Sequence, residues 1–407
     1  MKSKSGPWKQ QKKVRTLCSD KGGNDMKKLT RVISVCAAAA MVLTAVSPVF
    51  AEDEKFVIGG IGPVTGAAAA YGISVMNGAQ LAVDEINAAG GINGYQVEFI
   101  SADDEHDAEK SVNAYNDLKD KGMQMLLGTV TSAPCIAVGG EAANDNMFLL
   151  TPSGSAVDCI AYENAFRVCF SDPAQGAKSA QFIGEHELAA KVGIIYDSSD
   201  PYSTGIMESF VAEAANQGIE IVSNEAFSDN RTDFSAQLNK AKDAGAELVF
   251  LPFYYQEAAL VLKQASDMDY APKFFGCDGM DGILTVENFD TSLAEGLMLL
   301  TPFTPNAEDE MTQNFVAAYE EAYDGLVPIQ FGADAYDGIY AIKAALEDAG
   351  ATPDMSVSDL CEALKVSMGN ITVEGLTGTI TWDAATGEPE KEPKAVMIEN
   401  SEYVAMD

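Results

Sequence analysis

Two short loops of small and hydroxyl-bearing residues are the strongest candidates for chemistry in this chain of 407 residues. Residues 128–133 (Gly-Thr-Val-Thr-Ser-Ala) follow one apolar run, and residues 151–155 (Thr-Pro-Ser-Gly-Ser) follow the next. If the two runs are strands of one parallel sheet, the loops lie at its carboxyl edge, where α/β proteins bind ligands. Hydroxyl groups and free backbone amides near helix N-termini would form a cradle for a carboxylate or a phosphate there.

A second set of polar residues follows later apolar runs. Residues 253–255 (Phe-Tyr-Tyr) follow the run at 248–251, and Asp278 follows the phenylalanines at 274–275. An acid at the edge of one sheet and an anion cradle at the edge of another would together bind a zwitterion, because a few convergent polar groups fix a ligand's orientation.

Other chemistry is disfavoured. Residues 59–66 (Gly-Gly-Ile-Gly-Pro-Val-Thr-Gly) resemble a dinucleotide loop, but Thr65 replaces the third glycine and Pro63 removes an amide. The sequence has no G-x-S-x-G elbow, no HExxH motif and no nucleophile–base pair, so we predict that the protein is not an enzyme. The acidic residues 103–107, which include His106, are more typical of a solvated loop before a helix than of a metal site. We predict no metal and no cofactor.

The composition narrows the class of partner. The chain has 26 Lys and Arg against 61 Asp and Glu, a formal charge of −35, so nucleic acid is excluded as a partner because it requires a basic surface. The hydrophobic fraction of 47% is that of a globular protein. The length allows two or three domains.

The N-terminal region has the three parts of a secretory signal peptide. Residues 26–31 are basic, residues 32–46 are an apolar run, and a small-residue cleavage site ends at Ala51. The apolar run is short for a membrane span. We therefore expect export to the periplasm or to the extracellular face of a bacterial membrane.

Two further expectations concern this region. A lipid anchor on Cys36 is disfavoured, because Val35 stands where a small residue is required. Translation is expected to begin at Met26, since residues 21–23 can be encoded by a bacterial ribosome-binding sequence. Residues 1–51 are thus interpreted as leader plus signal peptide.

Five cysteines follow the signal peptide, and none forms a C-x-x-C pair, which disfavours zinc and thioredoxin-type chemistry. An odd number outside the cytoplasm leaves at least one thiol unpaired. Cys159 and Cys169 are close enough in sequence for a disulfide, but their spacing does not show whether the β-carbons face each other.

Strand and helix patterns alternate along the rest of the chain, which predicts βαβ units, parallel sheets and an α/β fold. The predicted strands are residues 56–59, 95–100, 123–127, 147–150, 192–196, 220–222 and 248–251, and the predicted helices are 78–88, 111–120, 206–217 and 234–244. The pattern breaks near residues 172–173, 301–305 and 375–379. Three crossovers fit two lobes joined by a three-stranded hinge.

These crossovers give the predicted domain boundaries. Lobe one would comprise residues 55–172 with 302–378, and lobe two residues 173–301 with 379–407.

Several motifs occur in the order found in one known family. They are residues 61–66 with 71–72, 77–87, 90–94, 150–152, 166–167 and 172–176, then 381–383 with Gly387. By these motifs the chain, from Phe56 to its C-terminus, resembles the type I periplasmic substrate-binding proteins of branched-chain amino acid ABC transporters, the leucine/isoleucine/valine-binding proteins. The resemblance implies the type I periplasmic-binding-protein fold, with two parallel-sheet lobes.

The resemblance also implies an amino-acid site. Ser132 and Ser155 would bind the α-carboxylate through hydroxyls and amides, and Ser153 would offer backbone groups. Tyr254 and Asp278 would meet the α-ammonium from the second lobe. The side-chain pocket would be walled by Tyr71, Tyr202 and Phe331, with Val130 and Thr131 as its floor. Two departures stand out: better-known members have a cysteine pair near His106 and Thr131, and a glutamate in place of Asp278.

The predicted function is that of a monomeric solute receptor, which captures a free α-amino acid, branched-chain or otherwise apolar, and delivers it to the permease and ATPase of an ABC importer. Two alternatives stay open. The protein could be the ligand-sensing subunit of a signalling system, although such receptors normally continue into a membrane span or a cytoplasmic module. It could also be an importer receptor for a different small carboxylate or amide.

Overall fold

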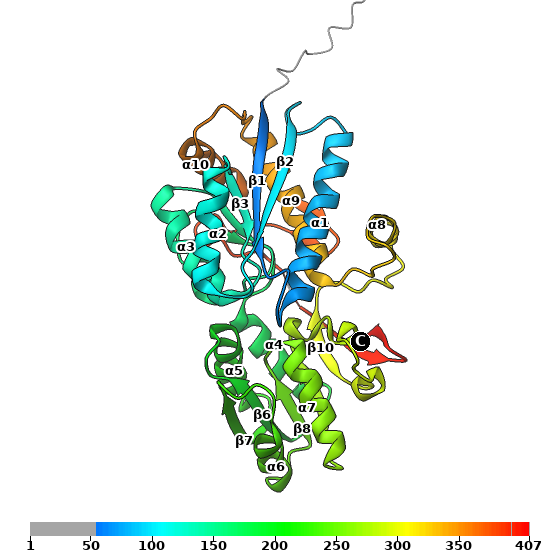
Figure 1. The fold of residues 1–407 in the computed structure, drawn as a ribbon. Coiled ribbons are helices and arrows are strands. Elements are labelled where there is room, and N and C mark those ends of the chain that lie inside the picture. Colours follow the sequence, from blue (N-terminus) through cyan, green and yellow to red (C-terminus); the bar gives the residue numbers. More distant parts are fainter. Residues whose placement is uncertain (1–53, 392, 407) are drawn as a thin grey trace, which may run out of the picture. The chain divides into compact units, whose positions relative to one another are not determined.

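Residues 54–391 and 393–406 are described by a computed structural model, and most of their strands lie in two separate sheets (Figure 1). The predicted leader, the start at Met26, the signal peptide and its cleavage site fall outside the described residues.

The first sheet has five parallel strands in the order β2-β1-β3-β4-β5. The central strand β3 reads Met-Leu-Leu-Gly and is buried throughout, as expected for a strand with helices on both faces. The strands are β1 (Lys55–Gly62), β2 (Gln96–Asp103), β3 (Met125–Gly128), β4 (Leu149–Thr151) and β5 (Ala165–Arg167).

Helices cover both faces of this sheet (Figure 1). On one face α1 (Ala69–Ala88) packs against α9 (Gln330–Asp348), and on the other α2 (Ala108–Asp120) packs against α3 (Ser132–Asp145). Beside them lie α8 (Glu310–Ala322), α10 (Val357–Met368), the short helix η1 (Val157–Ile160) and the hairpin β11 (Val373–Gly375) and β12 (Gly378–Ile380). We call this group the first layer.

The second sheet has seven strands in the order β14-β13-β10-β9-β8-β6-β7. Strands β6 to β10 are parallel, whereas β13 and β14 add an antiparallel edge. The strands are β6 (Lys191–Asp197), β7 (Glu220–Phe227), β8 (Leu248–Leu251), β9 (Lys273–Gly276), β10 (Met298–Thr301), β13 (Lys394–Glu399) and β14 (Glu402–Ala405).

The second sheet is also covered on both faces. Helices α4 (Asp172–Glu185) and α5 (Pro201–Ala214) pack together on one face, and α6 (Ser235–Asp243) and α7 (Tyr255–Asp267) lie on the other. Three short helices follow β9, namely η2 (Asp278–Met280), η3 (Ile283–Thr285) and η4 (Thr291–Ala294). We call this group the second layer.

Side-chain caps explain where several helices begin. The carboxylate of Asp107 accepts the amide of Lys110 at the start of α2, and that of Asp200 accepts the amide of Tyr202 at the start of α5. Such caps satisfy backbone amides that have no partner inside the helix.

The α/β fold with parallel sheets is confirmed. The three-stranded hinge and the lobe boundaries stay predictions. The bounds of several predicted elements differ. The helices expected at 78–88 and 206–217 begin at Ala69 and Pro201. The strand expected at 147–150 is Leu149–Thr151, and the strand expected at 220–222 extends to Phe227. The early part of α1 is rich in alanine and buried residues, so it lacks the polar stripe by which a surface helix is recognised.

All five cysteines of the described residues are free thiols. A disulfide between Cys159 and Cys169 is therefore not formed. Cys159 instead lies beside Cys135, and its Sγ donates a hydrogen bond to the carbonyl oxygen of Ser132 at 3.7 Å. Within the described residues, no helix is both long enough and apolar enough to cross a membrane.

Candidate functional site

One small cavity gathers nine of the ten predicted site residues. It is lined from the first layer by Tyr71, Val130, Thr131, Ser132, Ser153 and Phe331, and from the second layer by Tyr202, Tyr254, Asp278 and Gly279. About 10 Å³ is left between these side chains, roughly the space for one water molecule. A larger ligand would therefore fit only if some of these side chains moved.

The first-layer side of the cavity has donors suited to a carboxylate. Ser132 is the first residue of α3, whose N-cap, Thr131, makes no side-chain capping bond. The hydroxyl of Ser132 accepts the amide of Ala156 at 3.2 Å, so its own hydrogen remains available to a ligand. The first amides of a helix have no intrahelical partner and lie at the positive end of the helix dipole. Both effects favour an anion at this point.

The two serines of the 151–155 loop have different surroundings. Ser153 lines the cavity, and its hydroxyl donates to the carbonyl oxygen of Val130 at 2.7 Å, which ties the two loops together. Ser155 does not line the cavity; its buried hydroxyl lies beside Asp172 and makes no hydrogen bond among the described atoms. Its expected contact with a carboxylate stays a prediction.

The second-layer side of the cavity contains one buried carboxylate. Asp278 is 4% exposed, and its Oδ1 accepts hydrogen bonds from the hydroxyl of Tyr202 and from the amide of Gly279, both at 2.7 Å. Its own amide donates to Oε1 of Gln175 at 3.1 Å. Burial raises the pKa of Asp278 to about 6, although these hydrogen bonds lower it in part. Asp278 is thus mostly ionised at neutral pH.

The two tyrosines next to Asp278 differ from the expectation in one respect, which is the hydroxyl that bonds to Asp278. From the sequence we expected the hydroxyl of Tyr254 to lie beside Asp278, and Tyr202 to form only part of the pocket wall. In the structure Tyr202 donates to Asp278, whereas the ring of Tyr254 stacks on that of Tyr202, with centroids 4.9 Å apart, and its hydroxyl interacts with Asp200. Tyr202 lies at the start of α5 and Tyr254 at the start of α7, and the sequence does not specify how these two helix starts are placed relative to Asp278.

Aromatic rings form the remaining walls. The centroid of Tyr71 lies 4.2 Å from that of Phe331 and 5.5 Å from that of Tyr254. The hydroxyl of Tyr71 donates to the carbonyl oxygen of Gly279 and accepts the amide of Tyr255 at 3.3 Å. Tyr71 therefore joins the two layers directly at the cavity.

His106 is a neighbour of the site that the sequence did not assign to it. Its Nδ1 lies 2.8 Å from the hydroxyl of Thr131, and its ring packs edge-on against Tyr254. The expectation of a solvated 103–107 loop is wrong for Asp104, which is fully buried, accepts the amide of His106 and has its pKa raised to about 6 by burial. The helix that follows begins at Ala108, three residues before the predicted start at Ser111, and Asp107 caps it.

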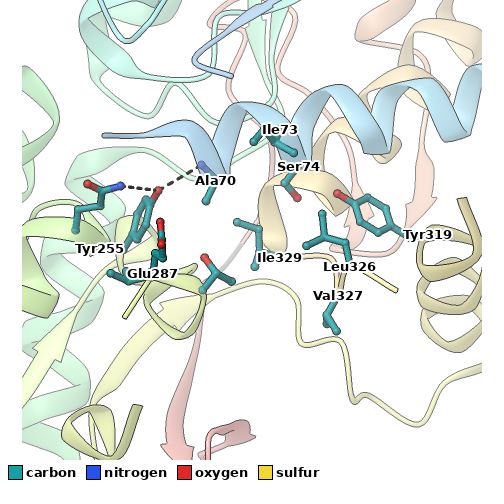
Figure 2. A pocket seen from close by; sticks show the side chains of 12 residues that line it. Ala70, Ile73, Ser74, Tyr255, Glu287, Tyr319, Leu326, Val327 and Ile329 are labelled. Atoms are coloured by element: carbon teal, nitrogen blue, oxygen red, sulfur yellow. Dashed lines mark hydrogen bonds between the residues drawn. The ribbon is translucent and has the colours of Figure 1, made fainter. Parts of the chain in front are cut away.

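Larger hollows also exist, but none of the predicted site residues lines them. A cavity of about 300 Å³ is lined by apolar residues that include Ile73, Leu326, Val327 and Ile329, together with Tyr255 (Figure 2). Besides its one lining carboxylate, Glu287, the cavity is lined by the hydroxyl residues Ser74, Thr285 and Tyr319. Within the described residues, no three His, Cys, Asp or Glu side chains are grouped to hold a metal ion. The small cavity is thus the better candidate for a ligand site.

The known proteins to which this chain is similar are binding proteins. A family profile described as "periplasmic binding protein" matches residues 55–401. The Leu/Ile/Val-binding protein homolog 3 of Brucella melitensis is 32% identical over 81% of this chain and 88% of its own length. The leucine-, isoleucine-, valine-, threonine- and alanine-binding protein of Pseudomonas aeruginosa is 28% identical over 88% of this chain and 93% of its own length.

A solved structure of a similar protein has the same fold. The branched-chain amino acid transporter substrate-binding protein of Streptococcus pneumoniae, crystallised with isoleucine, superposes with a TM-score of 0.77 at 28% identity. The match covers 87% of this chain and all of the other.

Proposed function

The chain belongs to the family of periplasmic binding proteins, which are not enzymes, and from that premise we propose that it captures a free α-amino acid with an apolar side chain. It would deliver this amino acid to the permease and ATPase of an ABC importer. The single observation that carries the proposal is the opposition, across one cavity, of an ionised carboxylate and a helix N-terminus rich in donors.

The α-carboxylate would lie at the start of α3. Ser132 supplies a hydroxyl and an amide there, and Ser153 holds the neighbouring loop in place. The lining residues include no Lys or Arg of the described chain, so neutral donors and the helix dipole would balance the ligand's negative charge.

The α-ammonium would lie against Asp278. Two hydrogen bonds occupy Oδ1 of this carboxylate, whereas Oδ2 is not used by either of them. A buried carboxylate is stabilised strongly by a cation in contact with it, because the protein interior screens charge poorly. Asp278 would thus bind the ammonium group.

The side-chain subsite would be apolar. Tyr71, Phe331 and Val130 contribute apolar surface and no charge, which disfavours acidic and basic amino acids. The branched-chain amino acids named for the relatives fit this description.

We also propose that residues 55–172 with 302–378 and residues 173–301 with 379–407 act as two closing lobes. The separate sheets support this division, and so does a cavity with lining residues from both layers. Ligand would favour closure through contacts that both lobes make with it. Membership of the family further implies that the protein acts outside the cytoplasm.

A thermal-shift screen of the twenty amino acids tests the proposal, since a ligand that binds only the folded state raises the unfolding temperature. Leucine, isoleucine, valine or another apolar amino acid should stabilise the protein, and aspartate, glutamate, lysine and arginine should not. Stabilisation by a charged amino acid alone, or by none of the twenty, would contradict the proposal.

A further inference from the structure

The segment that carries Asp278 is held by residues of the first layer that lie outside the proposed ligand contacts. Gln330, the first residue of α9, donates its side-chain amide to the carbonyl oxygen of Asp278 at 3.0 Å. The backbone amide of the same residue donates to Oδ2 of Asp281 at 2.8 Å. Residues 278–281 belong to the second layer, so both bonds join the two layers.

Asp281 acts as the N-terminal cap of a helix from the other layer. The residue at the N-cap position of α9, Ile329, makes no side-chain capping bond. The carboxylate of Asp281 satisfies the first free amide of α9 with Oδ2 and accepts the amide of Gly282 with Oδ1 at 2.9 Å. Asp281 is 3% exposed, so its bonds lie in a surrounding of low dielectric, which strengthens them. The bond to Gln330 exists only while the two layers are in contact.

Neighbouring bonds strengthen the same junction. Figure 2 shows the hydroxyl of Tyr255, from α7, accepting the backbone amide of Ala70, next to Ile329; this bond measures 3.3 Å. Tyr403 of β14 contacts Asp281 within the second layer and so holds it in place. Neither contact includes a group assigned to an amino acid.

We propose that Asp281 is a positioning residue, which docks the Asp278 segment onto the N-terminus of α9 and so populates the closed arrangement before any ligand is bound. This inference rests on the proposed lobe closure. A ligand that binds the closed form has an apparent Kd equal to its intrinsic Kd divided by the closed fraction. Asp281 would therefore increase affinity without contacting the ligand.

The size of the effect follows from its role as a cap. Loss of a side-chain N-cap weakens the capped state by about 2- to 30-fold. In Asp281→Ala the ratio of closed to open protein should fall by this factor. Asp281→Asn keeps an oxygen that can accept from Gln330 and should open less.

Small-angle X-ray scattering at pH 7.5 without ligand tests this. Asp281→Ala should have a larger radius of gyration than the wild type, and Asp281→Asn an intermediate one. The matched control is Asp290→Asn, because Asp290 caps the short helix η4 and its carboxylate accepts from Ser292 within the second layer. It should leave the radius unchanged. Circular dichroism shows that each variant is folded.

Equal radii for the wild type and both Asp281 variants would overturn the inference, and so would an equal increase in the Asp290 control. If Asp281→Ala does not fold, the radius of gyration of Asp281→Asn is compared with that of the wild type. A larger radius supports the inference, and an equal radius overturns it. The measurement needs no amino acid. If the wild type binds none, the proposed ligand fails, whereas the comparison of unliganded radii still reports on Asp281.

Discussion

At the scale of single residues, we propose that Asp278 determines what the cavity can bind. Tyr202 and Gly279 fix the orientation of its carboxylate, and Gln175 holds its backbone. These three partners are neutral, so the carboxylate has no buried cation in hydrogen-bond contact. A ligand with an ammonium group would supply the missing charge.

Replacement of this carboxylate should therefore remove most of the affinity. In Asp278→Asn the ammonium of the ligand would be buried without its partner, which costs about 3–5 kcal/mol, or a hundredfold to several thousandfold in Kd. Isothermal titration calorimetry with the amino acid found by the screen measures this. Asp290→Asn is the control and should bind like the wild type. A loss below about tenfold for Asp278→Asn would mean that Asp278 does not contact the ammonium.

The affinity should also depend on pH in a defined direction. The pKa of Asp278 is raised to about 6 by burial, and a bound ammonium would favour the ionised form, so protons and ligand compete for the carboxylate. Below pH 6 the Kd should rise, by at most about tenfold per pH unit, and above pH 7 it should be constant. Calorimetry between pH 5 and 8 tests this.

The variant Asp278→Asn separates this titration from that of other groups, such as His106. Its weaker binding should change little between pH 5 and 7. A variant with the same pH profile as the wild type would show that another group causes the dependence.

The motifs located this chemistry but not its details. Ser132 and Asp278 follow strands, and residues after the strands of a parallel sheet meet at its carboxyl edge, so their importance could be predicted. The partners of their hydrogen bonds could not. Whether Tyr202 or Tyr254 reaches Asp278 depends on how the starts of α5 and α7 are placed at the edge of the second sheet, which sequence spacing does not determine.

At the scale of elements, the N-terminus of α3 is the proposed anion site. The sequence did not predict this helix, because Pro134, Gly139 and Gly140 are typical of loops. Pro134 is tolerated in the first turn, where its missing amide has no intrahelical partner in any case. Helix α9 was also missed; most of its residues are buried, so it does not read as a surface helix.

The hydroxyl at this helix start should matter for binding. Ser132→Ala removes one donor to the ligand carboxylate, and a hydrogen bond to a charged group contributes about 1.5–3 kcal/mol, so the Kd should rise about 10- to 150-fold. Ser235→Ala is a matched control, because Ser235 is likewise the first residue of a helix, α6, away from the cavity. Similar Kd values for the two variants would exclude Ser132 from the site.

At the scale of the whole molecule, several aspartates are buried around the cavity and the junction of the layers. Burial raises the pKa of Asp200, Asp278, Asp281 and Asp337 to about 6 each. In the unfolded chain an aspartate titrates near 3.9. Between pH 4 and 6 the folded state thus binds more protons than the unfolded state.

The stability should therefore fall as the pH rises from 4 to 6, and level off above that range. The lost stability is at most about 3 kcal/mol for each fully shifted carboxyl group. Urea unfolding without ligand should have a higher midpoint at pH 5.5 than at pH 7.5. The opposite order would mean that these aspartates are stabilised as anions by partners, which would also weaken the argument for an ammonium at Asp278.

The central claim is that the cavity binds both the α-carboxylate and the α-ammonium of an amino acid. One titration tests this claim most directly. The amino acid that stabilises the wild type is compared by calorimetry with its desamino analogue, the carboxylic acid of the same carbon skeleton. Both fill the apolar subsite and present the carboxylate to α3, but only the amino acid has an ammonium for Asp278. The analogue should bind at least a hundredfold more weakly. Equal affinity would contradict the claim and identify the protein as a receptor for a small carboxylate.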